Sequence, residues 1–254
     1  MITRANDIVE WIRRQVTIAG ARGLVVGLSG GLDSAVVARL CQLAMPGAAV
    51  GAIMPCHSDP RDEQDADLVV SRFDLPAVRL DLAPAYDHLL GDLRTLVPQV
   101  PKDQDADGPS ADTKAQVSFA NIKPRLRMSA LYFIANSLNY LVVGTGNRSE
   151  LTVGYFTKHG DGAADLLPLG RLLKSEVRML ARELEIPEEI IEKAPSAGLW
   201  SGQTDEEEMG FSYADLERYL TDGPEAVSPA LAMRIERLVR MTEHKRALAL
   251  MPET

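Results

Sequence analysis

The 254-residue sequence has only two cysteines and no excess of basic residues. Two thiols cannot form the set of disulfides that stabilises small secreted domains, so we expect Cys41 and Cys56 to be reduced. Lysine and arginine total 27, against 36 aspartates and glutamates, which gives a formal net charge of -9. A nucleic-acid or anionic-membrane partner normally requires a basic patch, and we therefore expect neither partner.

Long apolar runs are also absent. No segment approaches the ~20 apolar residues of a transmembrane helix, and residues 1–20 lack the apolar core of a signal peptide. We therefore predict a cytoplasmic protein. The hydrophobic share of 46% is ordinary for a globular protein, and the length suffices for one large core. Because no internal repeat or domain boundary is visible, we predict a single domain over residues 1–254.

Short apolar runs alternate with segments of helical periodicity along most of the chain. The runs that predict buried strands are 24–26, 48–54, 78–82 and 140–144. The segments that predict helices are 5–18, 35–41, 61–73, 85–96, 116–138, 173–184, 188–191, 213–220 and 231–241. This alternation predicts an α/β fold, a three-layer sandwich with a parallel sheet of about five strands.

Two stretches and one proline interrupt this pattern. Residues 98–114 are rich in proline, aspartate and glycine, which predicts a solvated loop with a gating role as the alternative. Residues 195–209 predict a second loop that leads into a helix. Pro124 lies inside the helix expected over 116–138, where it either kinks that helix or marks its true start.

A glycine-rich turn joins the first predicted strand to the next helix, with the sequence GLSGGLDS at 27–34. Adjacent glycines allow a tight turn, and the N-terminus of the following helix offers N–H groups to a phosphate. Nucleoside-triphosphate loops place a lysine before the Ser/Thr, whereas Asp33 precedes Ser34 here. A carboxylate beside phosphates needs a bridging cation, so Asp33 predicts Mg²⁺ on a pyrophosphate group. The alternative makes Asp33 an ordinary helix N-cap.

Three later residues carry chemistry that the same crevice can use. Thr145 follows the fourth predicted strand, and ligands of parallel sheets bind beyond the carboxyl ends of strands. Glu150 is either a second metal ligand or an acid that complements a helix dipole. Lys174 opens a helix, where a cation opposes the dipole, which favours a phosphate partner or an ion pair with Glu176 or Glu183.

Six stretches, in order and over nearly the whole chain, resemble the NAD⁺ synthetase family: LSGGLDS, NIKPRLRM, GTGNRSE, GYFTKHGDGAADLLPLG, KAPSAGLWSGQTDEEEMGFSY and HKR. The resemblance implies an adenine nucleotide alpha hydrolase-like fold and a ligase that forms a C–N bond. ATP would adenylate the nicotinate carboxylate of deamido-NAD⁺ and release pyrophosphate. Ammonia would then attack the acyl-adenylate to give NAD⁺ and AMP. Since the chain begins one helix before the glycine-rich turn, we expect no glutaminase domain.

The resemblance also implies a role for each matching residue. ATP would be bound by Gly27, Leu28, Ser29, Gly30, Gly31, Leu32, Asp33, Ser34, Thr145, Lys174 and Ser196. Deamido-NAD⁺ would be bound by Arg125, Lys158, Asp165, His244 and Lys245. Asp33 and Glu150 would hold Mg²⁺, and the catalytic residues would be Asp33, Lys174 and Asp161, with Asp161 or Asp165 serving ammonia. The family is commonly a homodimer, and residues 126–138 are the candidate seam.

Two other interpretations remain open. Other amidating ligases of the same superfamily, such as those that make GMP, asparagine or a modified nucleobase, would share LSGGLDS but not KHGDGAADL and PSAGLW. A non-catalytic adenine-nucleotide module would not need Asp33, Glu150 and Lys174 together. Cys56 and His57 are unlike a nucleophile and its base, because neighbours on an extended segment point to opposite sides.

Overall fold

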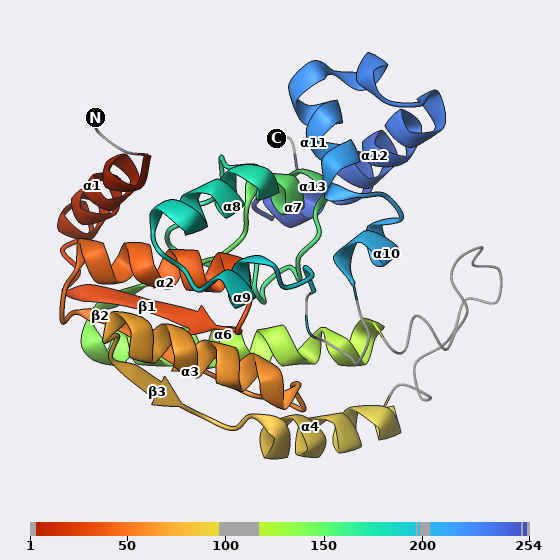
Figure 1. Cartoon of the computed structure of the whole chain (residues 1–254). Coiled ribbons are helices and arrows are strands. Elements are labelled where there is room, and N and C mark those ends of the chain that lie inside the picture. The colour runs from red at the N-terminus through yellow and green to blue at the C-terminus, as the bar shows by residue number, and fades with distance from the viewer. Residues whose placement is uncertain (1–3, 97–116, 197, 199–203, 250, 253–254) are drawn as a thin grey trace.

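The computed structural model describes residues 4–96, 117–196, 198, 204–249 and 251–252. Its centre is a parallel sheet with the strand order β3-β2-β1-β4 (Figure 1). The strands are β1 (Gly23–Leu28), β2 (Ala49–Ile53), β3 (Ala77–Arg79) and β4 (Tyr140–Val143). The described residues thus form four strands where about five were expected. A single parallel bridge between Val143 and Leu166 extends the edge beyond β4.

The central strand β1 is apolar on both faces, which is why it reads as a continuous hydrophobic run. Leu24 and Val26 belong to the core on one side of the sheet, and Val25 to the core on the other. In register, Leu24 lies opposite Ala49 of β2 and Leu141 of β4. Burial on both sides requires helices on both faces, and the structure confirms the predicted three layers.

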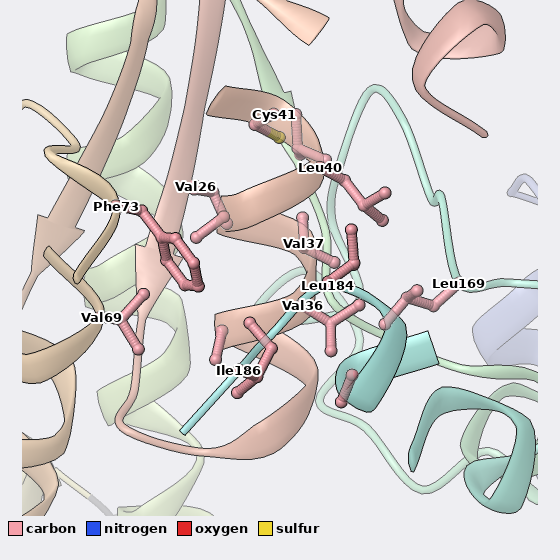
Figure 2. Close-up of a cluster of buried hydrophobic side chains, with 14 of the residues drawn as sticks. Val26, Val36, Val37, Leu40, Cys41, Val69, Phe73, Leu169, Leu184 and Ile186 are labelled. Carbon is pink, nitrogen blue, oxygen red and sulfur yellow. The ribbon is translucent and has the colours of Figure 1, made fainter. Parts of the chain in front are cut away.

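The first helical layer packs on the side of Leu24 and Val26. Figure 2 shows Val36, Val37 and Leu40 together with Phe73 and Ile186 in this core. All of the residues labelled there are less than a tenth exposed, so the layer is a tightly packed support for the turn that follows β1. Its helices are α1 (Arg4–Ile18), α2 (Leu32–Ala44), α3 (Pro60–Phe73), α8 (Lys174–Glu183) and α9 (Glu188–Ile191).

The second layer covers the opposite face with α4 (Ala83–Leu96) and α6 (Ile122–Leu138). A third hydrophobic cluster holds a separate helical lobe beside the sheet (blue in Figure 1). The helices of this C-terminal part, together with the short α7 that packs against it, are α7 (Arg148–Val153), α10 (Asp205–Met209), α11 (Tyr213–Asp222), η2 (Pro224–Ala226), α12 (Pro229–Met241) and α13 (Glu243–Arg246).

The interruptions predicted from the sequence have mixed outcomes. α6 begins at Ile122, with Pro124 in its first turn, so the proline marks the start of this helix rather than a kink. The loop expected over 98–114 lies outside the described residues. Of the loop expected over 195–209, the last five residues form α10. Cys41 and Cys56 are buried free thiols. Within the described ranges, every helix is too short or too polar to cross a membrane.

Candidate active site

A cavity of about 460 Å³ opens where β1 and β4 end. After β1 the chain builds β2 and β3 on one side and β4 on the other, so the strand order reverses between β1 and β4. Such a switch point is where open parallel sheets bind ligands. Ser29 from the first turn and Thr145 from the turn after β4 both line the cavity, as the sequence predicted.

The turn between β1 and α2 is held by its own serines. Ser34 Oγ accepts a hydrogen bond from Ser29 N at 3.2 Å and donates one to the Gly31 carbonyl at 2.9 Å. Gly30 has φ +75°, and a Cβ there would lie 2.2 Å from the carbonyl oxygen of Asp62, so only glycine fits. Gly30 is the one residue of 27–34 that does not line the cavity. The turn therefore keeps its backbone open to a ligand.

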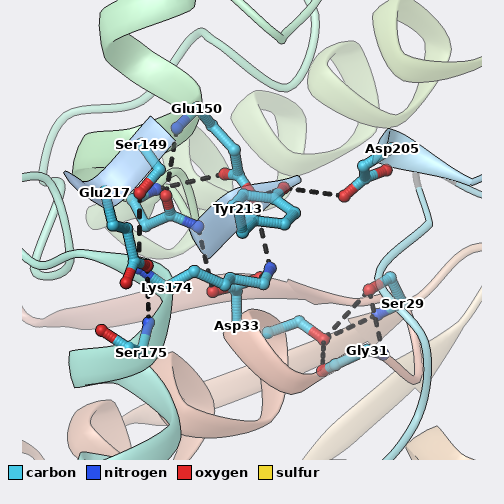
Figure 3. Close-up of polar contacts among 12 residues, drawn as sticks. Ser29, Gly31, Asp33, Ser149, Glu150, Lys174, Ser175, Asp205, Tyr213 and Glu217 are labelled. Atoms are coloured by element: carbon cyan, nitrogen blue, oxygen red, sulfur yellow. Dashed lines mark hydrogen bonds and ion pairs between the residues drawn. The ribbon is translucent and has the colours of Figure 1, made fainter. Parts of the chain in front are cut away.

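Asp33 faces into this cavity and is not the helix cap. α2 begins at Leu32, with Gly31 as its N-cap, which places Asp33 in the first turn. The N-cap alternative is therefore wrong. The Asp33 carboxylate instead meets Lys174 across the cavity, as Figure 3 shows.

Lys174 is buried between two carboxylates. Its Nζ pairs with Asp33 Oδ2 and lies 3.3 Å from Glu150 Oε1, and its side chain is 5% exposed. Burial by itself would lower the pKa of Lys174, but attraction to Asp33 and Glu150 outweighs it and raises this pKa above its ordinary value of 10.5. Glu176, an expected partner, instead pairs with Arg4 at 2.8 Å. The unusual lysine at the helix start thus serves the site.

Glu150 has the helix-start role considered for it, and its second carboxylate oxygen is left to face the cavity. Its Oε2 accepts from Asn147 N at 3.2 Å, while Asn147 Oδ1 accepts from Glu150 N at 3.1 Å, which forms a capping box. Its Oε1 faces Lys174. Burial raises the pKa of Glu150 to about 7, with Lys174 opposing this shift and Asp33 adding to it. Glu150 therefore ionises with difficulty unless more positive charge is nearby.

A third acid, Asp205 at the start of α10, was missed by the sequence analysis. It is 4% exposed, and its Oδ2 accepts a hydrogen bond from the hydroxyl of Tyr213 at 2.9 Å. Its Oδ1 has no hydrogen-bond partner among the described residues. The Tyr213 hydroxyl also lies 3.4 Å from Glu150 Oε1, and Lys174 Nζ lies 5.3 Å from the centre of the tyrosine ring (Figure 3). Lys174 thus lies among three acids, of which Asp205 is buried and Asp33 and Glu150 are partly buried.

The donor set of this cluster suits a hard divalent cation. Two carboxylates converge on one point that already attracts a cation, and a third carboxylate oxygen nearby is unpaired. The part of the chain that the structure describes has no group of three or more His, Cys, Asp or Glu side chains arranged to hold a metal by themselves. Mg²⁺ is usually held by one or two carboxylates, with phosphates and water completing its shell. The residues present therefore fit such an ion in the company of a phosphate ligand.

Asp161 and Lys245 line another part of the cavity. Asp161 Oδ1 accepts from Thr157 N at 2.9 Å, and Lys245 Nζ donates to the carbonyls of Gly154 and Phe156, both at 2.8 Å. The Asp161 side chain is open to the cavity, and the protein around it raises the pKa of this carboxyl by desolvation. Burial also lowers the pKa of Lys245. An acid and an amine with shifted pKa values are thus brought together, as expected of proton-transfer sites.

Four of the residues expected to bind the dinucleotide do not line the cavity: Arg125, Lys158, Asp165 and His244. Lys158 Nζ donates to the His244 carbonyl, and Arg125 donates to the Lys158 carbonyl at 3.4 Å. Asp165 Oδ2 accepts from Val142 N at 2.7 Å. Three of them, Arg125, Lys158 and His244, therefore form a chain of contacts beside the cavity.

Three further cations line the cavity without having been expected there. Arg127 donates to the Met54 carbonyl at 3.1 Å and to Ser58 Oγ at 3.2 Å. Lys193 lies 2.8 Å from Asp62 Oδ1 and also pairs with Asp65. The third is Arg178 of α8. Ser196, which was expected, does line the cavity.

Comparison with known proteins gives a consistent result. Residues 4–249 match the family model described as NAD synthase. The NH(3)-dependent NAD(+) synthetase of Carboxydothermus hydrogenoformans is 47% identical over 249 residues, which are 98% of this chain and 96% of that protein. The structure of NMN synthetase from Francisella tularensis superposes with a TM-score of 0.87 at 37% identity, covering 99% of this chain and 98% of that one. The NH3-dependent NAD synthetase from Campylobacter jejuni gives 0.77 at 27% identity, covering 98% of both chains.

Proposed function

The chain belongs to the NAD synthase family, and we propose that its cavity catalyses the ATP-dependent amidation of deamido-NAD⁺ by ammonia. The chain is a ligase that forms a C–N bond, with ATP as co-substrate and NAD⁺, AMP and pyrophosphate as products. A carboxylate resists attack because its leaving group would be oxide, whereas the adenylate supplies a good leaving group. The observation that carries this proposal is that the 27–34 turn, Thr145 and Lys174 line one cavity at the switch point of the sheet.

We propose that Asp33 and Glu150 hold Mg²⁺ together with the phosphates of ATP. The ion supplies charge neutralisation for the triphosphate and for the leaving pyrophosphate. The support is the donor set described above and the raised pKa of Glu150, which more positive charge nearby would return toward its ordinary value. Asp33 and Glu150 are both oriented by Asn147, because its Nδ2 donates to Asp33 Oδ1 at 3.3 Å and its backbone N donates to Glu150 Oε2 at 3.2 Å.

Lys174 stabilises negative charge on the reacting phosphate in this proposal. Its ammonium is held at the mouth of the 27–34 turn, and a cation in a water-poor site interacts strongly with developing charge. The side chain needs no reorganisation to face a phosphate there, since the protein has already positioned it. The N–H groups at the start of α2 face the same ligand.

Asp161 is the better candidate for the acid that serves ammonia. Ammonia must attack as a neutral base, so a nearby carboxylate has to take a proton from ammonium before the attack or from the protonated nitrogen of the adduct before AMP leaves and the amide forms. Asp161 lines the cavity, whereas Asp165 lies outside it with one oxygen bound to Val142 N. The raised pKa of Asp161 brings it closer to the range in which a carboxylate accepts a proton.

The residues that lie beside the cavity support a homodimer. If Arg125, Lys158 and His244 bind the second nucleotide of deamido-NAD⁺, that nucleotide lies beside the cavity rather than inside it. Phe133 on α6 is 73% exposed and Leu138 at the end of the same helix is 43% exposed, so α6 carries apolar surface that a partner would cover. We propose that a second copy packs along α6 and completes the site for deamido-NAD⁺. Analytical ultracentrifugation of Phe133→Glu tests this, because a monomer is then expected.

The NMN synthetase relative makes a second substrate a candidate. The corresponding mononucleotide carries the same nicotinate carboxylate, so the cavity chemistry described above would serve it equally. The two substrates differ in the adenylate half, which only the residues beside the cavity would contact. Comparing kcat/KM for the dinucleotide and for the mononucleotide, in the wild type and in Arg125→Ala, distinguishes them: only dinucleotide turnover should fall in the variant.

Pyrophosphate release from ATP tests the function directly. We expect release to depend on deamido-NAD⁺ and on Mg²⁺, and NAD⁺ to form with ammonium but not with glutamine. ATP turnover without deamido-NAD⁺, or with a different carboxylate substrate, would instead point to one of the other amidating ligases. Nucleotide binding without turnover would identify a binding module. We also propose that the chain acts as a single synthetase domain in the cytoplasm, where its two buried thiols stay reduced.

A further inference from the structure

Arg178 differs from every other cation in the cavity. The described residues contribute five cationic side chains to the lining: Arg127, Lys174, Arg178, Lys193 and Lys245. Four of them donate hydrogen bonds to protein oxygens, as described above. The guanidinium of Arg178 has no hydrogen-bond or ion-pair partner among the described residues. It is therefore the cation that a ligand can engage without first breaking a contact within the protein.

The position of Arg178 places it beside the phosphate end of the cavity. Arg178 follows Lys174 by four residues on α8, so both side chains lie on one face of that helix with their Cβ atoms about 5–6 Å apart. Lys174 is engaged with Asp33 of the glycine-rich turn and with Glu150. Arg178 thus places a further positive charge on α8, one helical turn beyond the acid–lysine cluster of Asp33, Glu150, Asp205 and Lys174.

The other charged side chains of the site leave the phosphates of ATP without enough positive charge, and Arg178 can supply it. The three acids around Lys174 leave an excess of two negative charges there, which a divalent cation offsets. The two acids on Lys193 leave a further negative excess of one. Neither group of side chains as a whole, lysine and acids together, therefore carries net positive charge toward a bound triphosphate. A guanidinium with five free N–H donors matches the paired oxygens of a terminal phosphate and forms strong charge-assisted hydrogen bonds with them.

We propose that Arg178 binds the β- and γ-phosphates of ATP and holds them as the pyrophosphate leaves. This inference rests on the proposed function. In the adenylation step the carboxylate oxygen forms a bond to the α-phosphorus, and the bond from that phosphorus to the β-bridging oxygen breaks. The electron pair goes to the pyrophosphate, which gains negative charge. By the proposal, Arg178 contacts this pyrophosphate group rather than the AMP half, and it therefore stabilises the leaving group.

Product inhibition of the native enzyme, measured with Mg²⁺ present, distinguishes pyrophosphate binding by Arg178 from a general effect on nucleotide binding. Arg178→Gln should raise the inhibition constant of pyrophosphate, and the KM of ATP, about 10- to 100-fold, the loss expected for hydrogen bonds to a charged group. The inhibition constant of AMP should stay within about twofold, because AMP lacks the phosphates concerned. Arg178→Lys should give intermediate values of both constants, since lysine keeps the positive charge but lacks the paired N–H donors of the guanidinium. The matched control is Arg182→Gln on the same helix, where Arg182 pairs with Glu188 at 3.2 Å and Glu192 at 2.9 Å on the surface.

Two results would overturn the proposal. One is an unchanged inhibition constant for pyrophosphate in Arg178→Gln, and the other is an equal loss for AMP and pyrophosphate. If Arg178→Gln did not fold, the same comparison with Arg178→Lys decides. Calorimetric titration of inorganic pyrophosphate into wild type and variant, with no other substrate, tests the role of Arg178 separately from the proposed function. If the wild type binds pyrophosphate through Arg178 but does not amidate deamido-NAD⁺, the proposed function is contradicted and the pyrophosphate-binding role of Arg178 is not.

Discussion

Replacing Lys174 by methionine is the sharpest test of the acid–lysine cluster. Methionine keeps much of the length of the side chain and removes the charge, so Asp33 and Glu150, each 16% exposed, lose their common partner. Removing one member of a buried ion pair typically costs about 3–5 kcal/mol of unfolding free energy. For a protein of this size that corresponds to a fall in Tm of roughly 6–20 °C. The raised pKa of Glu150 softens the loss, because protonation of this acid relieves the repulsion.

The same substitution should remove transition-state stabilisation. Loss of a positioned charge of this kind lowers the rate about 100- to 1000-fold, so pyrophosphate release should fall by that factor below the variant's own Tm. The matched control is Arg182→Met on α8, whose surface ion pairs contribute about 0–1 kcal/mol each. Pyrophosphate release near the wild-type rate in Lys174→Met would refute the catalytic role. A Tm equal to that of the control would refute the buried ion pairs.

Three further predictions concern the acids and their partners. Glu150→Gln should raise the Mg²⁺ concentration needed for half-maximal pyrophosphate release by about 10- to 100-fold, the usual cost of disturbing a metal site, and an unchanged requirement would exclude Glu150 as a ligand. Tyr213→Phe should lower the unfolding free energy by about 1–3 kcal/mol in urea, because a buried carboxylate loses its donor, whereas Tyr219→Phe, with no hydrogen bond at that hydroxyl among the described residues, should not. Burial raises the pKa of Asp161 above 3.8, so the folded protein holds the carboxyl proton more tightly than the unfolded chain does. The free energy of unfolding should therefore fall as the pH rises from 3.8 to the raised pKa. Asp161→Asn should flatten that decline in urea titrations at several pH values.

The strands and most helices could be predicted because the pattern that positions them is local. β1 and β2 are apolar runs covered on both faces, and runs of that kind have few alternatives. β3 was less well predicted: the run 78–82 forms a strand only to Arg79, and Val78 and Leu80 are 45% and 46% exposed. An edge strand buries fewer of its apolar side chains, so the apolar pattern does not indicate at which residue the strand pairing ends.

The partners within the site could not be read from the sequence in the same way. Lys174 is out of place at a helix start, and that signal pointed to an anion, but its partners lie 141 and 24 residues away. Asp205 stands in a run of four acids, of which only this one is buried. A usable signal existed: Met209 follows Asp205 by one helical turn and is also buried, which marks the inward face of α10.

The acid–lysine cluster is poorly explained by stability alone. Lys174 and Asp205 are taken out of water at a cost of several kcal/mol for each ion, Asp33 and Glu150 are partly removed from it, and one lysine cannot offset three acids. Apolar residues of similar volume would serve a purely structural core at least as well. The unpaired oxygen of Asp205 and the difficult ionisation of Glu150 are both relieved by more positive charge at this point. These features agree with the proposal that the cluster is completed by a cation and a phosphate chain, and with the proposed role of Arg178, which no oxygen among the described residues engages, on the side of the leaving group.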